Sequence, residues 1–178
     1  LKINAVIQRG VNEDQILPLA NHFRDSGHII RFIEFMDVGN TNSWRMTDVV
    51  TSAEMLEILN RTYTFRAIDS ERNSDVARLW EDADSGYRIG IISSISQPFC
   101  GDCSRARLSA DGRLFTCLFS SVGHDIKSVL RREDDVGDEI RRIWNDRDDR
   151  FSEIRSQIEN NEEEITNTEL EIKEAKKW

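Results

Sequence analysis

Hydrophobic and polar positions alternate with two different periods in the first hundred residues. The β-branched and aromatic runs at 3–8 and 29–36 are typical of buried strands. Between them, Asn12 is expected to open a helix, and Pro18 predicts a kink or a late start near Leu17, because proline removes an amide donor. A strand, a helix and a second strand in this order predict the β-α-β unit of a parallel sheet.

The pattern further along predicts a second helix and more strands. A capping box formed by Thr51 and Glu54 predicts where this helix begins. Its spacing would turn Met55, Leu56 and Leu59 toward the core. Three further strands are expected at 63–68, 76–80 and 88–95.

The last third of the chain has a helical pattern. One helix face would carry Val136, Ile140, Ile143 and Trp144. Past residue 157, isoleucines recur every seventh position among glutamates and asparagines, a repeat too short to establish a coiled coil. We expect a solvated or frayed helix there, with a partner-binding helix as the alternative.

Composition and charge narrow the classes of function. The 178 residues carry a net charge of -9, which argues against non-specific nucleic-acid binding because such binding needs a basic face. No apolar run approaches the roughly 20 residues that cross a bilayer, and the first residues do not form a signal peptide. We therefore expect no membrane partner. Few cysteines, spaced for metal rather than for disulfides, indicate a reducing compartment and a cytoplasmic location.

The three cysteines, Cys100, Cys103 and Cys117, are the only ones in the chain. An odd number cannot pair completely in disulfides, and a Cys-x-x-Cys pair followed by a third thiol is a metal-binding spacing. A two-residue hairpin turn at Asp111-Gly112 would bring the third thiol back toward the first two. Three thiolates leave one position of a tetrahedral ion or a cubane cluster to another ligand or to a substrate.

The residues themselves leave two interpretations open. In the first, His124 completes a structural Cys3His zinc site, and the chain is a zinc-ribbon interaction module without catalysis. In the second, the fourth position stays open beside Arg105 and Arg107, which would share one strand face and clamp an anion such as phosphate. Exposed arginines are also common as plain solvated surface. Replacing His124 by alanine separates the two interpretations, because only the zinc site depends on it.

The stretch from Gln97 to Phe119, with its cysteines and paired arginines, closely resembles the C-terminal cluster motif of the GTP 3',8-cyclase family. This family of radical S-adenosylmethionine (SAM) enzymes opens the molybdenum cofactor pathway. The resemblance covers about residues 1–157 and includes the segments 2–7, 10–12, 31–36 and 147–152.

The resemblance implies an α/β fold in three parts. Residues 1–62 would be the C-terminal part of an incomplete radical-SAM (β/α) barrel. Residues 63–157 would be an α+β region that carries the iron-sulfur cluster loop and binds GTP. Residues 158–178 would be a divergent acidic helical tail.

The resemblance also implies roles for individual residues. A 4Fe-4S cluster whose open iron faces the purine of GTP would be held by Cys100, Cys103 and Cys117. Met36 matches a position that contacts SAM, and Arg31 is a possible active-site residue. The GTP-contacting positions would be Lys2, Arg105, Ala106 and Arg107.

The implied reaction converts GTP to (8S)-3',8-cyclo-7,8-dihydroguanosine 5'-triphosphate. A radical derived from SAM abstracts hydrogen from C3' of the ribose, and the ribosyl radical attacks C8 of guanine. In the family, a Cys-x3-Cys-x2-Cys motif holds the second 4Fe-4S cluster that generates this radical, and the present sequence does not contain it. We therefore expect the chain alone to be inactive and to depend on a missing N-terminal half. Without the strands of that half, an exposed sheet edge should make the chain poorly soluble. A homodimer is a further possible assembly.

Overall fold

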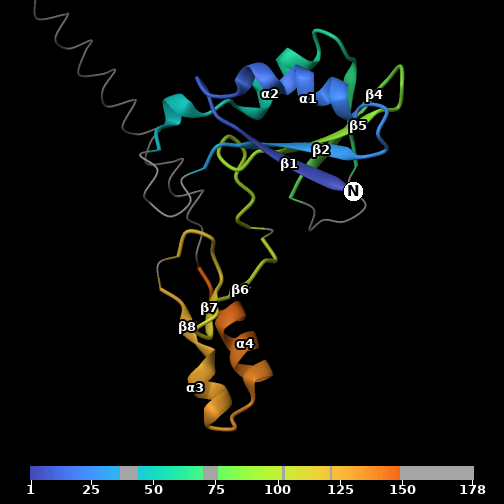
Figure 1. The fold of residues 1–178 in the computed structure, drawn as a ribbon. Helices are drawn as coiled ribbons and strands as arrows, with labels where there is room; N and C mark the ends of the chain where they lie inside the picture. The colour runs from blue at the N-terminus through green and yellow to red at the C-terminus, as the bar shows by residue number, and fades with distance from the viewer. Residues whose placement is uncertain (37–43, 70–75, 102, 121, 149–178) are drawn as a thin grey trace, which may run out of the picture. The chain divides into compact units, whose positions relative to one another are not determined.

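The structure is a computed structural model, and it describes residues 1–36, 44–69, 76–101, 103–120 and 122–148 (Figure 1). The chain divides into two compact units. We call the described part of Leu1–Phe99 the sheet unit, and the described part of Cys100–Phe151 the hairpin unit. The predicted tail at 158–178 lies outside the described residues.

The sheet unit is built on a five-stranded mixed sheet in the order β1-β2-β5-β4-β3. β1, β2 and β5 run parallel to one another. β4 pairs antiparallel with β5, and β3 pairs antiparallel with β4. The β-α-β unit and the predicted strands are confirmed, and the unit is of the mixed α/β class. The strands are β1 (Lys2–Ile7), β2 (Ile29–Glu34), β3 (Phe65–Ile68), β4 (Arg78–Asp82) and β5 (Arg88–Ile92).

The first helix starts late, as the proline predicts. A 3-10 turn, η1 (Glu13–Gln15), comes before α1 (Ile16–Phe23), so Pro18 lies in the first turn of α1, where no intrahelical amide bond is lost. Asn12 does stand at the predicted start, as the N-cap residue of η1, but its side chain makes no capping hydrogen bond. Its side chain instead accepts the amide of Gln8 at 2.8 Å and donates to the carbonyl of Val6, which closes the turn after β1.

The second helix, α2 (Ser52–Leu59), has the predicted capping box. The hydroxyl of Thr51 accepts the amide of Glu54, and the carboxylate of Glu54 accepts the amide of Thr51 at 2.8 Å. Met55 and Leu59 are fully buried, as their spacing predicts. A short 3-10 turn, η2 (Met46–Asp48), precedes this helix.

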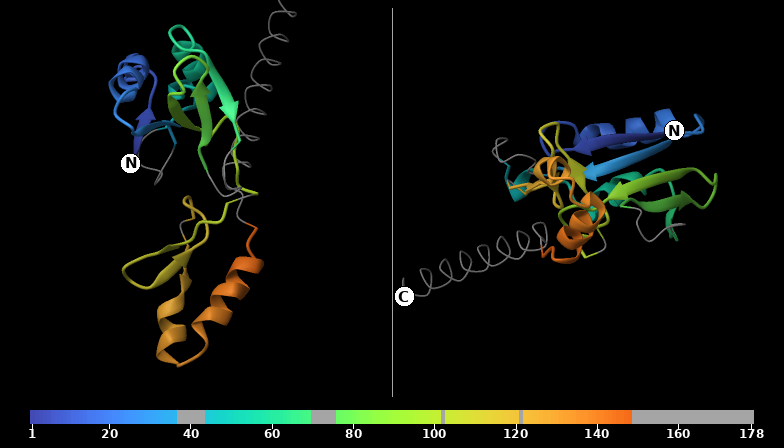
Figure 2. Two further views of the ribbon diagram at one scale, coloured as in Figure 1. Left: turned by 90° about the vertical axis from the view of Figure 1, so that its right-hand side faces the viewer. Right: turned by 90° about the horizontal axis from the view of Figure 1, so that it is seen from below.

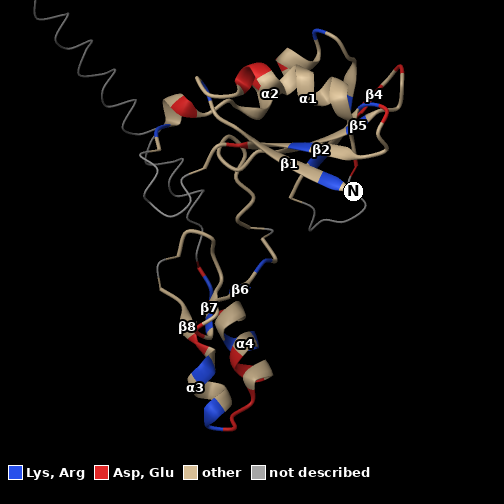
Figure 3. Ribbon diagram, in the orientation of Figure 1, with Lys and Arg blue, Asp and Glu red and all other residues tan. Residues whose placement is uncertain are grey.

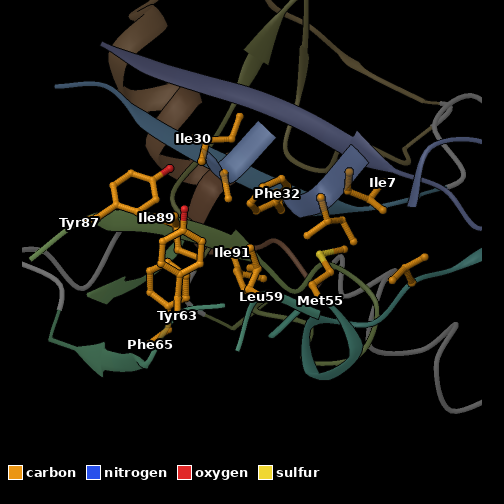
Figure 4. Close-up of a cluster of buried hydrophobic side chains, with 13 residues drawn as sticks. Ile7, Ile30, Phe32, Met55, Leu59, Tyr63, Phe65, Tyr87, Ile89 and Ile91 are labelled. Atoms are coloured by element: carbon orange, nitrogen blue, oxygen red, sulfur yellow. The ribbon is translucent and has the colours of Figure 1, made fainter. Parts of the chain in front are cut away.

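Both helices of the sheet unit pack on one face of the sheet (Figures 1 and 2). Figure 4 shows the core between them, in which Phe32 lies near the centre and Met55 and Leu59 reach it from α2. Tyr63, Phe65 and Tyr87 stack at tilted angles at one end of this core. Side chains alternate between the two faces along each strand. The strand residues next to Ile7, Ile30 and Phe32 therefore lie on the other face of the sheet.

The hairpin unit has a small antiparallel sheet in the order β6-β7-β8 and two helices. The two helices contact each other, and Figure 3 shows basic residues on the first and acidic residues at the start of the second. Acidic groups there stabilise a helix through its dipole. The elements are β6 (Arg107–Leu108), β7 (Arg113–Phe115), β8 (His124–Asp125), α3 (Ile126–Arg131) and α4 (Val136–Asn145).

The hairpin is confirmed, but its predicted two-residue turn is wrong. The amide of Ser109 donates to the carbonyl of Arg113 at 2.9 Å, so three residues form the loop. The last of them, Gly112, has φ +84°, a conformation that favours glycine.

The helical face predicted at the end of the chain is present on α4. Ile143 is 3% exposed and packs with Leu114, Ile126 and Val136. Ile140 is 36% exposed and thus lies at the margin of this face. None of the helices in the described part of the chain is long and apolar enough to cross a membrane.

Candidate functional site

The three cysteines lie on turns of the hairpin unit. All three are free thiols and all are half-buried. The amide of Cys103 donates to the carbonyl of Cys100 at 3.2 Å, which makes the Cys-x-x-Cys segment a turn. The amide of Ser120 donates to the carbonyl of Cys117 at 3.4 Å and forms a second turn.

The hairpin register relates the third cysteine to the first two. Arg107 of β6 faces Phe115 of β7, and both strands end their ladder there. Cys117 follows Phe115 by two residues, so it lies toward the same open end of the hairpin as Cys103. Arg107 is half-buried, whereas Arg105 and Ala106 precede the strand and are exposed. The argument from strand alternation therefore covers Arg107 and does not extend to Arg105.

Arg105 acts directly on one of the thiols. Its Nη2 lies 3.6 Å from the Sγ of Cys103 and donates to it. Burial acts to raise the pKa of the Cys103 thiol, but the backbone amide and the guanidinium of Arg105 outweigh burial and hold this pKa below its usual value. A thiolate is the form that binds metal. Arg105 thus favours the thiolate form of Cys103.

The chemistry of the donor set fits a thiolate-bound metal centre. The three free thiols of the hairpin unit form a soft donor set, which suits zinc and iron-sulfur clusters. Across the described ranges, no three His, Cys, Asp or Glu side chains are close enough together to hold a metal ion. His124, the alternative fourth ligand, is exposed on β8 and pairs with Leu114. The cysteine site and the zinc site therefore both stay predictions.

The sheet unit carries the other predicted residues. Lys2 is exposed at the start of β1, and Met36 is half-buried two residues after β2 ends. Arg31 lies in β2, with Asn4 of β1 and Gly90 of β5 as its neighbours in register. The sheet face that the helices leave uncovered carries Lys2, Asn4 and Arg31, because these residues alternate with the buried residues of β1 and β2.

Arg31 is held in place by both of its neighbouring strands. Its Nε donates to the Oδ1 of Asn4 at 2.8 Å. A Cβ added at Gly90 would lie 2.8 Å from the Cγ of Arg31, so only glycine leaves room for this side chain. The guanidinium is therefore fixed over the sheet. Asn4 and Gly90 were not predicted from the sequence, because their roles depend on the register between strands.

A buried carboxylate was also missed from the sequence. Glu34 at the end of β2 is fully buried and accepts hydrogen bonds from Ser52, Ile95 and Ser96. The available signal was a single acidic residue between apolar residues in a predicted strand. Such a residue needs partners in the interior, and sequence alone does not name them.

Comparison with known proteins defines the class of this chain. A protein-family model described as Molybdenum Cofactor Synthesis C matches residues 28–174, and the chain belongs to this family. Relatives with the name GTP 3',8-cyclase match most of the chain, which confirms the resemblance found in the cysteine and arginine motif.

Three of these relatives show the extent of the match. The cyclase of Xanthomonas axonopodis pv. citri is 51% identical over 159 residues, which are 89% of this chain and 48% of that protein. The cyclase of Parasynechococcus marenigrum is 48% identical, over 88% of this chain and 45% of its own length. The cyclase of Staphylococcus carnosus is 42% identical, over 88% and 47%. The chain thus spans about half the length of the curated relatives it matches.

Proposed function

We propose that this chain is the substrate-side part of a GTP 3',8-cyclase. With SAM, the whole enzyme would convert GTP to (8S)-3',8-cyclo-7,8-dihydroguanosine 5'-triphosphate in molybdenum cofactor biosynthesis. The observation that carries the proposal is the contact between Arg105 and Cys103 in the hairpin unit, which contains two further free thiols. The parallel strands of the sheet unit support its assignment to the C-terminal part of a radical-SAM barrel.

Cys100, Cys103 and Cys117 would hold a 4Fe-4S cluster. When bound, such a cluster with three protein ligands supplies an open iron position for the purine of GTP. Arg105 has two tasks in this arrangement. It stabilises the thiolate of Cys103, and its positive charge would attract an anionic substrate to the cluster.

The triphosphate of GTP would be bound by cationic side chains. Arg105 and Arg107 flank Ala106 beside the cysteine segment, and Lys2 offers an ammonium group on the uncovered face of the sheet. A guanidinium presents a planar fork of donors that matches phosphate oxygens. Fixing the nucleotide this way favours attack on one ribose carbon, because orientation alone can supply several kcal/mol of a barrier.

SAM would approach the carboxyl ends of the parallel strands. Met36 follows β2 at this edge, where α/β sheets commonly bind ligands, and Arg31 is fixed over the same strands. The cluster that generates the radical would be supplied by sequence other than residues 1–178. The chain alone would therefore bind GTP without turning it over.

The first test is anaerobic reconstitution with iron and sulfide, followed by a titration with GTP. We expect about four irons per chain and a cluster absorption that GTP perturbs. A colourless protein that keeps one zinc ion, ignores GTP and loses zinc after His124→Ala would refute the cyclase and establish the zinc-ribbon module.

A second test separates GTP binding from cluster binding. Arg107→Ala should weaken GTP binding by about tenfold to a hundredfold, the loss of a charge-assisted hydrogen bond, and leave the iron content intact. Arg66→Ala is the matched control, because Arg66 is exposed on β3 of the sheet unit. Loss of iron in Arg107→Ala would instead assign this arginine a structural role.

A further inference from the structure

Arg31 of β2 is a half-buried cation without an anionic partner in the described part of the chain. Its side chain makes one hydrogen bond there, from Nε to the Oδ1 of Asn4 at 2.8 Å. None of the ion pairs between described residues includes Arg31 or Lys2. A charge that burial partly removes from water usually has a partner of opposite charge. The nitrogens Nη1 and Nη2 of Arg31 therefore have donors left for a ligand.

Two neighbouring residues fix the place of this guanidinium. Gly90 of β5 lies under the stem of the side chain, because an added Cβ would come within 2.8 Å of the Cγ of Arg31 and 3.3 Å of its Cδ. Asn4 of β1 holds the other end, and its oxygen must face Nε because a guanidinium only donates. The two adjacent strands thus direct the fork of Nη1 and Nη2. Such a fork matches the oxygens of phosphate.

The sheet face around Arg31 carries excess positive charge. Lys2 lies on the same face, one strand across and two residues along, which places the two Cα atoms about 8 Å apart (Figure 3). Glu81 is the one acidic residue of the five described strands that alternates onto this face, and it pairs with Arg88 at 2.6 Å. Two cations that the described residues leave unpaired suit a ligand with several negative charges, such as a triphosphate.

We propose that Asn4 and Gly90 are positioning residues that hold the guanidinium of Arg31 ready to bind a phosphate group beside Lys2. All four residues belong to the sheet unit, so the site needs no contact from the hairpin unit. A guanidinium that is already held in place loses less conformational entropy when the phosphate binds. Only the identification of this phosphate as part of GTP rests on the proposed function.

The first test uses inorganic triphosphate, which probes the phosphate site without the purine and without the cluster. In the intact chain, triphosphate should shift the NMR signal of the Nε–H group of Arg31. Arg31→Lys identifies this signal by removing it. The same variant should raise the Kd for triphosphate about tenfold, because lysine keeps the charge and lacks the fork. A signal that triphosphate does not move would overturn the proposal.

Gly90→Ala tests the positioning directly. The backbone of Gly90 lies outside the left-handed region, so alanine fits the strand, and its methyl group meets the stem of Arg31. We expect the Nε–H group to exchange faster with water and the Kd for triphosphate to rise about threefold to tenfold. Gly86→Ala is the matched control from the same unit, because nothing lies within 4 Å of a Cβ added there. An equal rise in Gly86→Ala would overturn the proposal, since general destabilisation then explains both.

Two variants of Asn4 keep the test decisive if Gly90→Ala fails to fold, because Asn4 is exposed. Asn4→Ala removes the acceptor for Nε and should raise the Kd for triphosphate about threefold to tenfold. Asn4→Asp keeps an acceptor, but its negative charge would neutralise the guanidinium and should raise the Kd at least about tenfold. A purely structural Asn4 would tolerate aspartate. Wild-type affinity in either variant therefore contradicts the proposal.

A titration of the reconstituted iron-sulfur protein with GTP separates this inference from the proposed function. A cluster absorption that ignores GTP, together with triphosphate binding that Gly90→Ala weakens, overturns the proposed function and supports the phosphate site alone. A GTP response of the cluster with the same Kd in wild type and Gly90→Ala overturns the inference alone. An Nε–H signal that responds to methionine and not to triphosphate also overturns it, because the fork then selects a carboxylate.

Discussion

The sheet unit and the hairpin unit differ in how much apolar side-chain surface supports them. Thirteen buried side chains form one cluster in the sheet unit. In the hairpin unit the cluster has three buried members, Leu114, Ile126 and Ile143, with Val136 packed against them. Hydrophobic stabilisation grows with buried apolar area, so the hairpin unit has far less of it.

The candidate residues of the two units are held in correspondingly different ways. Arg31 is fixed by strand register, a hydrogen bond to Asn4 and close contact with Gly90. Cys100 and Cys117 lie on turns that single backbone hydrogen bonds close. Small units with small cores commonly need a metal or a disulfide for stability. A cluster bound by the cysteines would therefore add most to the stability of the hairpin unit.

The largest expected effect comes from the core of the sheet unit. Phe32→Ala removes a fully buried ring and should cost about 3–5 kcal/mol of unfolding free energy. Denaturant unfolding of the intact protein, followed by amide exchange in β1 and β2, measures this cost. Val6→Ala is the control, because Val6 is 49% exposed on β1 and its loss should cost less than about 0.5 kcal/mol. Equal costs would show that the sheet unit is not built on this core.

The next effect tests the small core of the hairpin unit. Ile143→Ala should cost about 2–3 kcal/mol, in the lower part of the range for such truncations, because few neighbours surround the side chain. Amides of β7 and α4 should lose protection while those of the sheet unit keep theirs. Ile140→Ala on the same helix is the control, since Ile140 is 36% exposed. Simultaneous loss of protection in both units would mean that they unfold as one.

The sequence predicted what local chemistry decides. The capping box of Thr51 and Glu54 involves residues three apart, and the period of the apolar positions identified β1, β2 and α4. The predicted length of the loop between β6 and β7 was wrong, because this length depends on which residues of the two strands pair. Asn12 stands at the predicted helix start, but its side chain makes hydrogen bonds in the turn after β1 and does not cap the helix.

The residues of the candidate site also differ in whether local sequence or tertiary structure identifies them. The spacing of the cysteines identified a metal-binding pattern without any tertiary information. Lys2 and Met36 came only from resemblance to a family, because a lysine at a strand end and a methionine after a strand have no distinctive local pattern. Glu34 was missed, since two of its partners lie more than sixty residues away. Such contacts are fixed by the sheet order and not by neighbours in sequence.

An intermediate effect compares one glycine from each unit. Gly112 has φ +84°, and a Cβ there would lie 2.7 Å from the Cβ of Lys127. Gly86 has φ +69°, with nothing within 4 Å of an added Cβ. Gly86→Ala should therefore cost about 1 kcal/mol of unfolding free energy from backbone strain, and Gly112→Ala about 2 kcal/mol because of the added clash. Thermal unfolding with amide exchange measures the loss of unfolding free energy in both variants. A larger loss in Gly86→Ala than in Gly112→Ala would contradict the close contact between Gly112 and Lys127.

The smallest effect is a pH dependence that separates the units. Burial acts to raise the pKa of Asp82, but hydrogen bonds from Ser85 and Thr64 outweigh burial and hold the pKa below its ordinary value of 3.8. The folded state therefore binds the proton more weakly than the unfolded state does. The resulting stability is present above pH 3.8 and is lost as the pH falls through the lowered pKa, at no more than about 1.4 kcal/mol per pH unit.

Asp82→Asn should flatten this acid limb in the unfolding free energy of the sheet unit. Asp125 caps α3 in the hairpin unit, and hydrogen bonds from Ser128 lower its pKa in the same direction. Asp125→Asn should therefore flatten only the acid limb of the hairpin unit. Glu54, whose pKa is also lowered, is present in both variants and cancels in their difference. Amide exchange between pH 5 and pH 3, read separately for β4 and α3, measures the acid transition of each unit. Altered exchange at β4 in Asp125→Asn would mean that the two units share one acid transition.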